Sequence, residues 1–470
     1  MHNESYKYAA MKKILVPISN SFFVRNFLRA GFLDDFDDGK EEFFFAVPKE
    51  KLDYYKKEFN FPNANFVETP PIASLRLERI FHGLETSMIP TRTVKMMHWF
   101  HFKRRGTKQK IIFRLPQFIF RMTLWNMGKR RLFRELLRFK YSVFSDRYHY
   151  SYLKELKPDL IFCPTMVYGN EWIFLREGRR LGIKTVGMTS NWDNLYAKTF
   201  LRVKPDSMMV QTGLMKKTAG RFCDYPSSKI KVTGVPQYDR HFKDPPRDGR
   251  QRFLEDLGGD TRKKTILYAF SGKVTSDLDE RMVDLLSGKI GSGGFAVPVQ
   301  LLVRSYPKRD FTPNKIEKLR QEKNILIRHS AKSVGDGKNS WEFDNEAIKF
   351  LSESLAYSDV VITACSTFLV EAAVFNRPVI SINFDAGEKF DYWNSARRFF
   401  DWDHLADLVP LKGIHLSDSP DDLYKAVNDY LRDPKLDEEG RKNIVRQQCT
   451  YTDGKSVQRV AEFIKNNLNL

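Results

Sequence analysis

The sequence predicts an α/β protein with two domains, each built on a parallel β-sheet. Short runs of β-branched and aromatic residues alternate with longer segments of helical periodicity, which is typical of βαβ units. The chain has 470 residues, which is more than one compact core usually holds. The expected architecture is therefore two α/β halves joined by a linker.

The first domain is predicted over residues 11–242. Each of its expected strands is short and apolar, and most of them are followed by a helical pattern. The strands are expected at 14–19, 43–48, 65–68, 158–164, 184–189, 206–211 and 231–239. Helices are expected to begin near Phe22 and near Asn170.

The second domain is predicted over residues 260–454. It follows a stretch rich in proline, glycine and charge, residues 243–263, which we expect to be the linker. Its strands are expected at 264–270, 299–304, 324–328, 359–363 and 378–383, with a later helix near Ser419. The last helix is expected within 455–470, and we expect this segment to pack back on the first domain.

The positive charge is concentrated in one segment of the first domain. The net charge is +20, and residues 92–140 hold 15 Lys or Arg but a single acid, Glu135, so this segment carries +14. Bulky apolar side chains, among them Trp99, Phe113 and Trp125, alternate with these cations. We therefore predict that residues 92–140 form a basic amphipathic helical insertion.

Three interpretations of residues 92–140 stay open. On an anionic bilayer, Lys and Arg would meet the headgroups while Trp and Phe lie at the acyl boundary, and we favour this membrane-facing role. Alternatively, the aromatic side chains face the protein core and the cations form a solvated rim. Nucleic-acid binding is the third and least favoured interpretation, because the segment is too apolar and no RRM, KH or helix-turn-helix signature accompanies it.

The cysteines and the hydropathy pattern predict the compartment. Four cysteines lie far apart and form no CxxC pair, so free thiols in a reducing environment are expected and a metal site is not. The N-terminal residues lack the apolar run of a signal peptide, and no stretch of about 18 apolar residues occurs. We expect a cytoplasmic protein that binds the cytoplasmic face of a membrane peripherally.

The most informative segment is residues 358–385, SDVVITACSTFLVEAAVFNRPVISINFD. It predicts a buried strand, a turn of small residues, a helix and a second buried strand. Ser366 or Thr367 can cap the helix, where backbone N–H groups favour a phosphate. Glu371 lies one turn further along, where a carboxylate can accept both hydroxyls of a ribose. The alternative is a plain βαβ unit with a capped helix and a solvated Glu.

At these residues, including Arg377-Pro378, the sequence resembles the C-terminal half of GT-B glycosyltransferases. It is most similar to the CDP-glycerol glycerophosphotransferase and UDP-N-acetylglucosamine 2-epimerase-like branches. The resemblance implies two Rossmann-like domains facing a cleft and a UDP- or CDP-linked donor as substrate, with no tightly bound cofactor and no metal. It also implies that Ser366 and Thr367 contact the donor diphosphate and that Glu371 holds its ribose.

Further candidate donor contacts lie at the ends of other strands of the second domain. Arg304 ends the predicted strand VQLLVR, where its guanidinium would neutralise a phosphate. The turn Ser271-Gly272-Lys273 stands where the resembling families bring a Gly/Ser loop to the phosphates, and a plain surface turn is the alternative. His329 ends a strand at the carboxyl edge, so it is either a donor contact or a rim histidine.

The acceptor side of the cleft is predicted in the first domain. The loop MTSNWDNLYAK directly follows a predicted strand and is dense in polar side chains. We expect Asn191, Trp192 and Asn194 of this loop, with Ser19 and Asn20 after the first strand, to line the cleft. Asx turns are the alternative explanation of the asparagines.

The resemblance also predicts the chemistry. In inverting GT-B enzymes the first domain supplies a general base, which makes Asp193 the first choice of base and Glu171 the second. The base would take the proton of an acceptor hydroxyl, while helix N-termini with Arg304 or Lys273 stabilise the departing phosphate.

The function implied is transfer of a sugar or polyol phosphate from a nucleotide donor to a membrane-associated acceptor in surface polysaccharide or glycolipid synthesis. A soluble UDP-sugar 2-epimerase shares the architecture but would not need the basic segment. A catalytically inactive carbohydrate- or nucleotide-binding protein is the other alternative.

Overall fold

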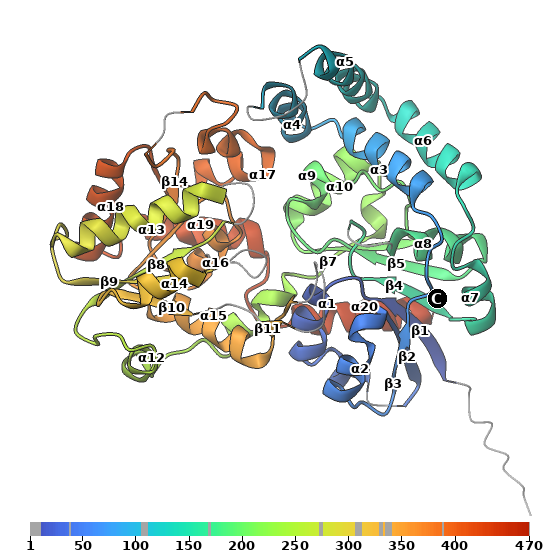
Figure 1. Ribbon diagram of the computed structural model, residues 1–470. Coiled ribbons are helices and arrows are strands. Elements are labelled where there is room, and N and C mark those ends of the chain that lie inside the picture. Colours follow the sequence, from blue (N-terminus) through green and yellow to red (C-terminus); the bar gives the residue numbers. More distant parts are fainter. Residues whose placement is uncertain are drawn as a thin grey trace, which may run out of the picture.

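The computed structural model shows two domains side by side, each with a parallel sheet flanked by helices (Figure 1). It describes residues 11–36, 39–104, 111–167, 171–271, 276–305, 313–328, 332–333, 341–387 and 390–469. The predicted α/β fold class is therefore confirmed.

The first sheet has seven parallel strands in the order β3-β2-β1-β4-β5-β6-β7. The strands are β1 (Lys12–Pro17), β2 (Glu41–Val47), β3 (Ala64–Glu68), β4 (Leu160–Cys163), β5 (Lys184–Met188), β6 (Ser207–Val210) and β7 (Ile230–Val232). Helices cover both faces, so that alternate side chains of one strand enter different cores, as Phe162 and Ile161 of β4 do.

The second sheet has six parallel strands in the order β10-β9-β8-β13-β14-β15. The strands are β8 (Lys264–Ala269), β9 (Val299–Arg304), β10 (Ile325–Arg328), β13 (Val360–Thr363), β14 (Val379–Ile382) and β15 (His415–Ser417). A two-stranded ribbon joins β11 (Lys332–Ser333) to β12 (Trp341–Glu342). In each sheet the strand order reverses beside its first strand, between β1 and β4 and between β8 and β13, where open α/β sheets bind ligands at their carboxyl edge.

Helices occupy most of the connections between strands. Those of the first domain are α1 (Ser21–Asn26), α2 (Lys49–Glu58), α3 (Arg76–Met88), α4 (Arg92–Lys103), α5 (Ile111–Gly128), α6 (Arg131–Phe144), α7 (Tyr150–Leu156), α8 (Glu171–Arg180), α9 (Asn194–Ala197), α10 (Gly213–Cys223) and α11 (Asp239–Lys243). The later ones are α12 (Arg250–Asp256), α13 (Ser276–Gly291), α14 (Pro313–Arg320), α15 (Asn345–Tyr357), α16 (Phe368–Val374), α17 (Asp403–Ala406), α18 (Pro420–Arg432), α19 (Glu438–Cys449) and α20 (Ser456–Leu468). In the described part of the chain, no helix is both long and apolar enough to cross a bilayer.

The exit from the first domain differs from the prediction. The strand expected at 231–239 ends at Val232, and 3₁₀ helix 236–238 follows it. Gly234 breaks the strand with a φ of 89°, in the left-handed region, and Pro236 is placed to start a helical turn. A Cβ on Gly234 would lie 2.4 Å from Ser456 Oγ, so the crossing between the domains requires glycine.

The chain returns to the first domain at its end. Val457, Val460, Ala461 and Ile464 of α20 are buried in the core that also contains β1, β2 and β4. Figure 1 shows α20 crossing the first domain, and it contacts β4 and β5. Burial of a side chain such as Ile464 contributes roughly 1.5–3 kcal/mol, so α20 fastens the C-terminus to the first sheet.

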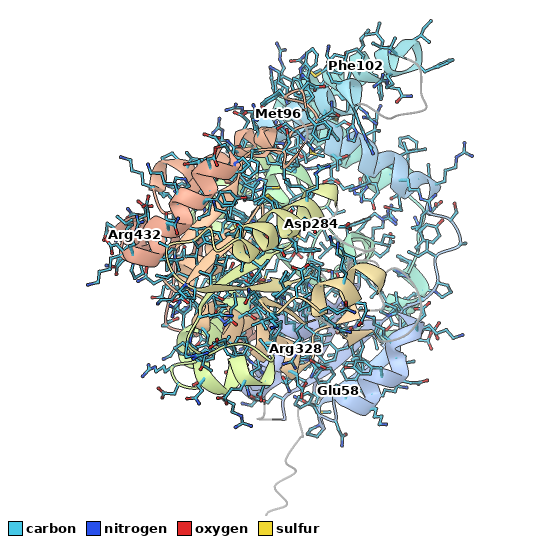
Figure 2. The ribbon with its side chains drawn as sticks, turned by 60° about the vertical axis from the view of Figure 1, so that its left-hand side comes forward. Glu58, Met96, Phe102, Asp284, Arg328 and Arg432 are labelled. Carbon is cyan, nitrogen blue, oxygen red and sulfur yellow. The ribbon has the colours of Figure 1, made fainter. Side chains whose placement is uncertain are left out.

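Helices α3 to α6 form an outer layer of the first domain (Figure 1). Two basic residues of α6 are buried in ion pairs, because Arg134 and Arg138 contact Asp224 at 2.6 and 3.1 Å. These cations of the segment 92–140 are thus structural. Figure 2 shows Phe102, near the end of α4, at the outer tip of the layer, while Met96 lies closer to the body of the protein.

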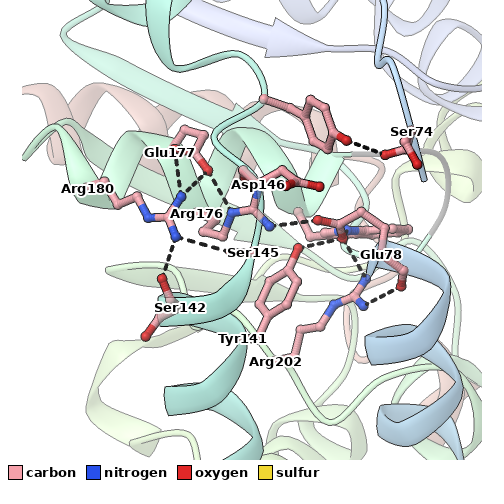
Figure 3. Close-up of polar contacts among 12 residues, drawn as sticks. Ser74, Glu78, Tyr141, Ser142, Ser145, Asp146, Arg176, Glu177, Arg180 and Arg202 are labelled. Carbon is pink, nitrogen blue, oxygen red and sulfur yellow. Dashed lines mark hydrogen bonds and ion pairs between the residues drawn. The ribbon is translucent and has the colours of Figure 1, made fainter. Parts of the chain in front are cut away.

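A buried network around Glu78 of α3 ties this layer to the sheet (Figure 3). Arg176 of α8 contacts Glu78 at 2.7 Å, and the Tyr141 hydroxyl of α6 donates to the same carboxylate at 2.7 Å. Although burial alone would raise the pKa of Glu78, the Tyr141 hydrogen bond and the Arg176 charge hold it below its ordinary value. The charged form is therefore stabilised where three helices meet.

Candidate functional site

The switch point of the first sheet holds a narrow pocket lined by both polar and apolar residues. It lies beyond the carboxyl ends of β1, β4, β5 and β6. Its lining includes residues that follow each of these strands: Asn20, Thr165, Ser190 and Gln211. Glu171, the first residue of α8, lines the same pocket.

Glu171 is the buried carboxylate of this pocket, with only 1% of its surface exposed. Ser19 Oγ donates to Glu171 Oε1 at 2.5 Å, and the Thr165 backbone N–H donates to Oε2 at 2.9 Å. Burial raises the pKa of Glu171 to about 8, against the smaller lowering effect of these hydrogen bonds. A carboxyl group that titrates near neutrality is suited to take and return a proton.

Asp193 has different surroundings. Lys198 Nζ lies 2.9 Å from its carboxylate, and Asn194 Nδ2 donates to it at 3.0 Å. Although burial would raise the pKa of Asp193, the charges of Lys198 and His404 and these hydrogen bonds lower it. Asp193 is therefore ionised but only weakly basic.

The three candidate asparagines of the first domain accept hydrogen bonds from nearby backbone N–H groups. Asn194 is fully buried, and its Oδ1 accepts from the backbone N–H groups of Ser190 and Asn191. Asn191 Oδ1 accepts from the N–H of the next residue, Trp192, at 2.9 Å, whereas the bond of an Asx turn is to the second residue on. Asn20 lines the pocket and also caps α1, because its Oδ1 accepts a hydrogen bond from the backbone N–H of Phe22.

Trp192 faces the second domain. Its ring and that of His404 in α17 are 5.1 Å apart in an edge-to-face arrangement. His404 is buried, and burial lowers its pKa. Through Trp192, the loop after β5 thus packs against the second domain.

Glu371 of α16 is the buried carboxylate of the second domain. It is 6% exposed, and burial raises its pKa, which the charges of Arg25 and Arg304 partly offset. Its Oε2 has no hydrogen-bond partner among the described residues. Glu371 lines a pocket with Arg25 of α1 and with Gln237 and Tyr238 of the domain crossing.

The other predicted donor contacts gather at the carboxyl edge of the second sheet. Arg304 ends β9, and its guanidinium lies 5.0 Å from the ring centroid of Phe368 in α16. Ser366 Oγ accepts from the Phe368 N–H at 3.3 Å, whereas Thr367 occupies the cap position without a side-chain bond to the helix.

Ser271, after β8, contacts Asp279 of α13 through both its N–H and its hydroxyl, at 3.3 Å each. Gly272, Lys273 and His329 lie outside the residues that the structure describes.

The pockets of Glu171 and Glu371 adjoin each other. Both are lined by Asn26 of α1 and by Pro236 of the domain crossing. Each carboxylate also belongs to the switch point of its own sheet, since Glu171 follows β4 and Glu371 follows β13. The two domains therefore bring one buried carboxylate each to a shared boundary.

Three cationic or titratable residues at this boundary were not among the sequence candidates: Arg25, Arg398 and His404. Arg25 Nη2 donates to Gln237 Oε1 at 2.8 Å beside Glu371. Arg398 is 5% exposed, and burial lowers its pKa although the nearby Cys365 and Asp385 raise it. No sequence pattern marks these residues, because each acquires its neighbours from the other domain or from a distant loop.

Direct contacts hold the domains together on both sides of the pockets. On one side, Glu342 of β12 contacts Lys51 at 2.6 Å and accepts hydrogen bonds from Ser21 and Tyr55. On the other side, the Thr93 hydroxyl of α4 donates to Asp403 at 2.7 Å.

Within the described residues no group of three or more His, Cys, Asp or Glu is placed to hold a metal ion.

Comparison with known proteins identifies the relatives of this arrangement. The sequence model of the family described as CDP-glycerol:poly(glycerophosphate) glycerophosphotransferase matches residues 169–466. No curated protein sequence matches the chain.

Several solved structures have a similar fold. UDP-GlcNAc 2-epimerase from Neisseria meningitidis bound to UDP-GlcNAc matches with a TM-score of 0.54 and 10% identity, over 97% of this chain and 100% of that one. MnaA of S. aureus with UDP matches with a TM-score of 0.52 and 13% identity, over 98% of each chain. The wall teichoic acid polymerase TagF with CDPG matches with a TM-score of 0.51 and 11% identity, over 97% of this chain and 89% of that one. The predicted GT-B type of fold and the predicted resemblance are confirmed.

Proposed function

We propose that this chain, which belongs to the CDP-glycerol:poly(glycerophosphate) glycerophosphotransferase family, transfers a polyol phosphate or a sugar from a nucleotide donor to a membrane-associated acceptor. The observation that carries the proposal is the pair of buried carboxylates, Glu171 and Glu371, at the two switch points. Their pockets adjoin, so a donor on one domain and an acceptor on the other would meet at the boundary.

The donor is assigned to the second domain. Glu371 would accept the ribose hydroxyls, since its buried Oε2 has no partner among the described residues. Arg304, at the end of β9, would meet the diphosphate together with the hydroxyls of Ser366 and Thr367. The guanidinium of Arg398 adds a second buried cation near this edge.

The acceptor is assigned to the first domain, with Glu171 as the general base in preference to Asp193. A pKa of about 8 leaves Glu171 partly ionised at neutral pH and basic enough to take a hydroxyl proton. The low pKa and the Lys198 ion pair of Asp193 argue against the same role there. Asn191 and Trp192 would then shape the rim of the acceptor site.

With CDP-glycerol, the acceptor oxygen would attack the phosphorus attached to glycerol. A new P–O bond forms, the bond to the bridging oxygen breaks, and CMP leaves with that oxygen while the acceptor proton goes to Glu171. With a UDP-sugar, the attack would be at the anomeric carbon and UDP would leave. The charge that develops on the departing phosphate is stabilised by the cations of the second domain.

The acceptor is assigned to a membrane because of the outer surface of α5 and α6. Of the eighteen large hydrophobic side chains that are exposed among the described residues, eleven lie on these helices. They are Ile111, Ile112, Phe113, Leu115, Ile119, Phe120, Leu132, Leu136, Phe139, Val143 and Phe144, which we name the α5–α6 ridge.

An exposed apolar surface of this extent, flanked by Lys and Arg, is suited to lie in the interface of an anionic bilayer. We place the protein at the cytoplasmic face of a membrane, in the synthesis of a surface polysaccharide or a teichoic-acid-like polymer.

A thermal-shift series with CDP, CMP, UDP, GDP and ADP tests the donor site. A ligand that binds only the folded protein raises its Tm with the ratio of concentration to Kd. We expect CDP or UDP to stabilise the wild type and Glu371→Ala to lose this shift. Glu439→Ala, which removes an exposed carboxylate of α19, is the control and should keep it. If no nucleotide shifts the wild type, or if Glu371→Ala responds as the wild type does, the assignment of the donor site is wrong.

A further inference from the structure

A cavity of about 540 Å³ lies in the outer helical layer, away from the two carboxylate pockets. It is lined by residues of α3, α4 and α5 and by Ala197, and we name it the α3–α5 cavity. Its lining residues are Arg79, Ile80, Gly83, Leu84, Thr86, Ser87, Val94, Met97, His98, His101, Gln117, Phe120, Arg121 and Ala197. A second cavity of about 200 Å³ adjoins it and shares His98, His101, Gln117 and Arg121.

The polar part of the α3–α5 cavity is cationic. Arg79 and Arg121 line the larger cavity, and Arg104 and Arg114 line the smaller one. No acidic residue is among the described residues that line either cavity. A lining with cations and no carboxylate favours an anionic ligand.

Arg121 is the cation common to both cavities. No carboxylate lies within ion-pair distance of it among the described residues, in contrast to Arg134 and Arg138 of the next helix. Its charge instead lowers the pKa of His98 and His101, on which burial has the larger effect. The histidines are thus neutral hydrogen-bonding groups beside an uncompensated guanidinium.

The rest of the α3–α5 cavity is apolar and continues to the protein surface. Ile80, Leu84, Val94 and Met97 line it on the α3 and α4 sides. Phe120 lines it on the α5 side and is 58% exposed, so this residue belongs both to the cavity and to the α5–α6 ridge. The cavity thus offers both cations and hydrocarbon, which a ligand with an anionic head and an apolar chain would contact.

We propose that the α3–α5 cavity binds the phosphate group of a membrane amphiphile, with Arg121, Gln117 and His101 around the phosphate and Phe120 and Ile80 beside the hydrocarbon. The ridge places Phe120 at the acyl boundary of the bilayer, so the cavity opens at the depth of the lipid phosphates. The guanidinium of Arg121 would form charge-assisted hydrogen bonds with the phosphate oxygens. This inference rests on the proposed membrane docking of the ridge and is independent of the transfer reaction.

Thermal shifts with octyl phosphate, inorganic phosphate and octanol test the inference. Octyl phosphate combines both features of the expected ligand, and the other two carry one feature each. We expect octyl phosphate to raise the Tm of the full chain at concentrations where inorganic phosphate and octanol have little effect.

Two variants locate the effect. Arg121→Gln should weaken octyl phosphate binding by about tenfold, because it removes a charged hydrogen-bond partner. Gln117 is exposed, and Gln117→Glu should weaken binding because it adds a negative charge beside the phosphate. This variant replaces Arg121→Gln in the test if Arg121→Gln does not fold. Lys140→Gln removes an exposed cation of α6 outside both cavities and should bind as the wild type does.

Three results would overturn the inference. Equal shifts from inorganic phosphate and octyl phosphate would assign the cavity to a free anion. Wild-type affinity in both Arg121→Gln and Gln117→Glu would place binding elsewhere. Displacement of octyl phosphate by a short oligonucleotide that binds the wild type but not Arg121→Gln would assign the cavity to nucleic acid. The nucleotide shifts of the donor site, measured on the same samples, show separately whether the proposed function fails.

Discussion

The Ser19 hydroxyl donates a hydrogen bond of 2.5 Å to Glu171 Oε1 and so joins the loop after β1 to the start of α8, across the switch point of the first sheet. The loop after β4 adds the Thr165 N–H at the other carboxylate oxygen. Burial nevertheless dominates, so that the pKa of Glu171 rises to about 8. A polar residue held in this way at a ligand-binding edge is a candidate for proton transfer.

The first prediction concerns Glu171→Gln. Loss of a general base typically lowers the rate by about 10²- to 10⁴-fold, and we expect kcat of transfer to fall within this range. Nucleotide binding should persist, because the donor is assigned to the other domain. Asp193→Asn is the matched comparison and should retain most of the activity. Full activity in Glu171→Gln, or a larger loss in Asp193→Asn, would return the role of base to Asp193.

The second prediction is a pH-dependent stability of the same variant. Because the folded protein holds the Glu171 proton more tightly than the unfolded chain does, this group lowers stability as pH rises from its ordinary pKa of 4.5 to about 8. Glu171→Gln lacks that loss, and each pKa unit corresponds to about 1.4 kcal/mol. The Tm of the variant relative to wild type should therefore rise between pH 5 and pH 9. A constant difference across this range would show that Glu171 has an ordinary pKa.

The third prediction concerns the anchor of α6. Asp224→Asn removes the carboxylate that pairs with the buried Arg134 and one of the two carboxylates that contact Arg138, and breaking a buried pair typically costs about 3–5 kcal/mol. Asn tolerates the left-handed backbone of this position, so the loss isolates the charge. Glu135→Gln, a partly exposed carboxylate of α6, should cost less than Asp224→Asn, because Arg138 keeps its contact with Asp224. Thermal unfolding followed by circular dichroism compares the variants, and equal effects would contradict the structural role of the buried pair.

The fourth prediction tests the crossing between the domains. Gly234→Ala should lower the Tm, because the position has a φ of 89° and the new Cβ would meet Ser456 of α20. Gly288→Ala is the control, since Gly288 lies in α13 with open space around it and alanine is favoured there by about 1 kcal/mol. Opposite signs of the two Tm changes are expected. A neutral Gly234→Ala would mean that α20 does not pack closely at the crossing.

Much of the fold follows from local pattern. The alternation of buried strands and helical segments predicts most strands of both sheets, because parallel strands covered on both faces are continuous apolar runs. The three-residue strand β15 has no such signal, and it forms because β14 offers it a partner. The strand expected at 231–239 is longer than the observed strand β7, since apolar content alone does not reveal the backbone turn at Gly234.

Residues of the candidate site that directly follow a strand can be predicted from the sequence. Residues that join the site only because the two domains pack together cannot. Glu371 and Arg304 could be named because strand ends converge at one edge of a sheet. Arg25 and His404 obtain their neighbours only when the domains pack, and no spacing in the sequence indicates that contact. From the sequence, Asp193 is the first choice of base and Glu171 the second. We propose the reverse order, because burial separates their pKa values and burial is a property of the fold.

The most direct test of the central claim is the identity of the nucleotide released in the presence of an acceptor. The chain would be incubated with CDP-glycerol or a UDP-sugar, with and without a lipid-linked acceptor, and the products separated by chromatography. We predict release of CMP from CDP-glycerol, or of UDP from a UDP-sugar, that requires the acceptor and is lost in Glu171→Gln. Conversion of a UDP-sugar to its epimer without an acceptor, or no release with either donor, would contradict the assignment as a transferase.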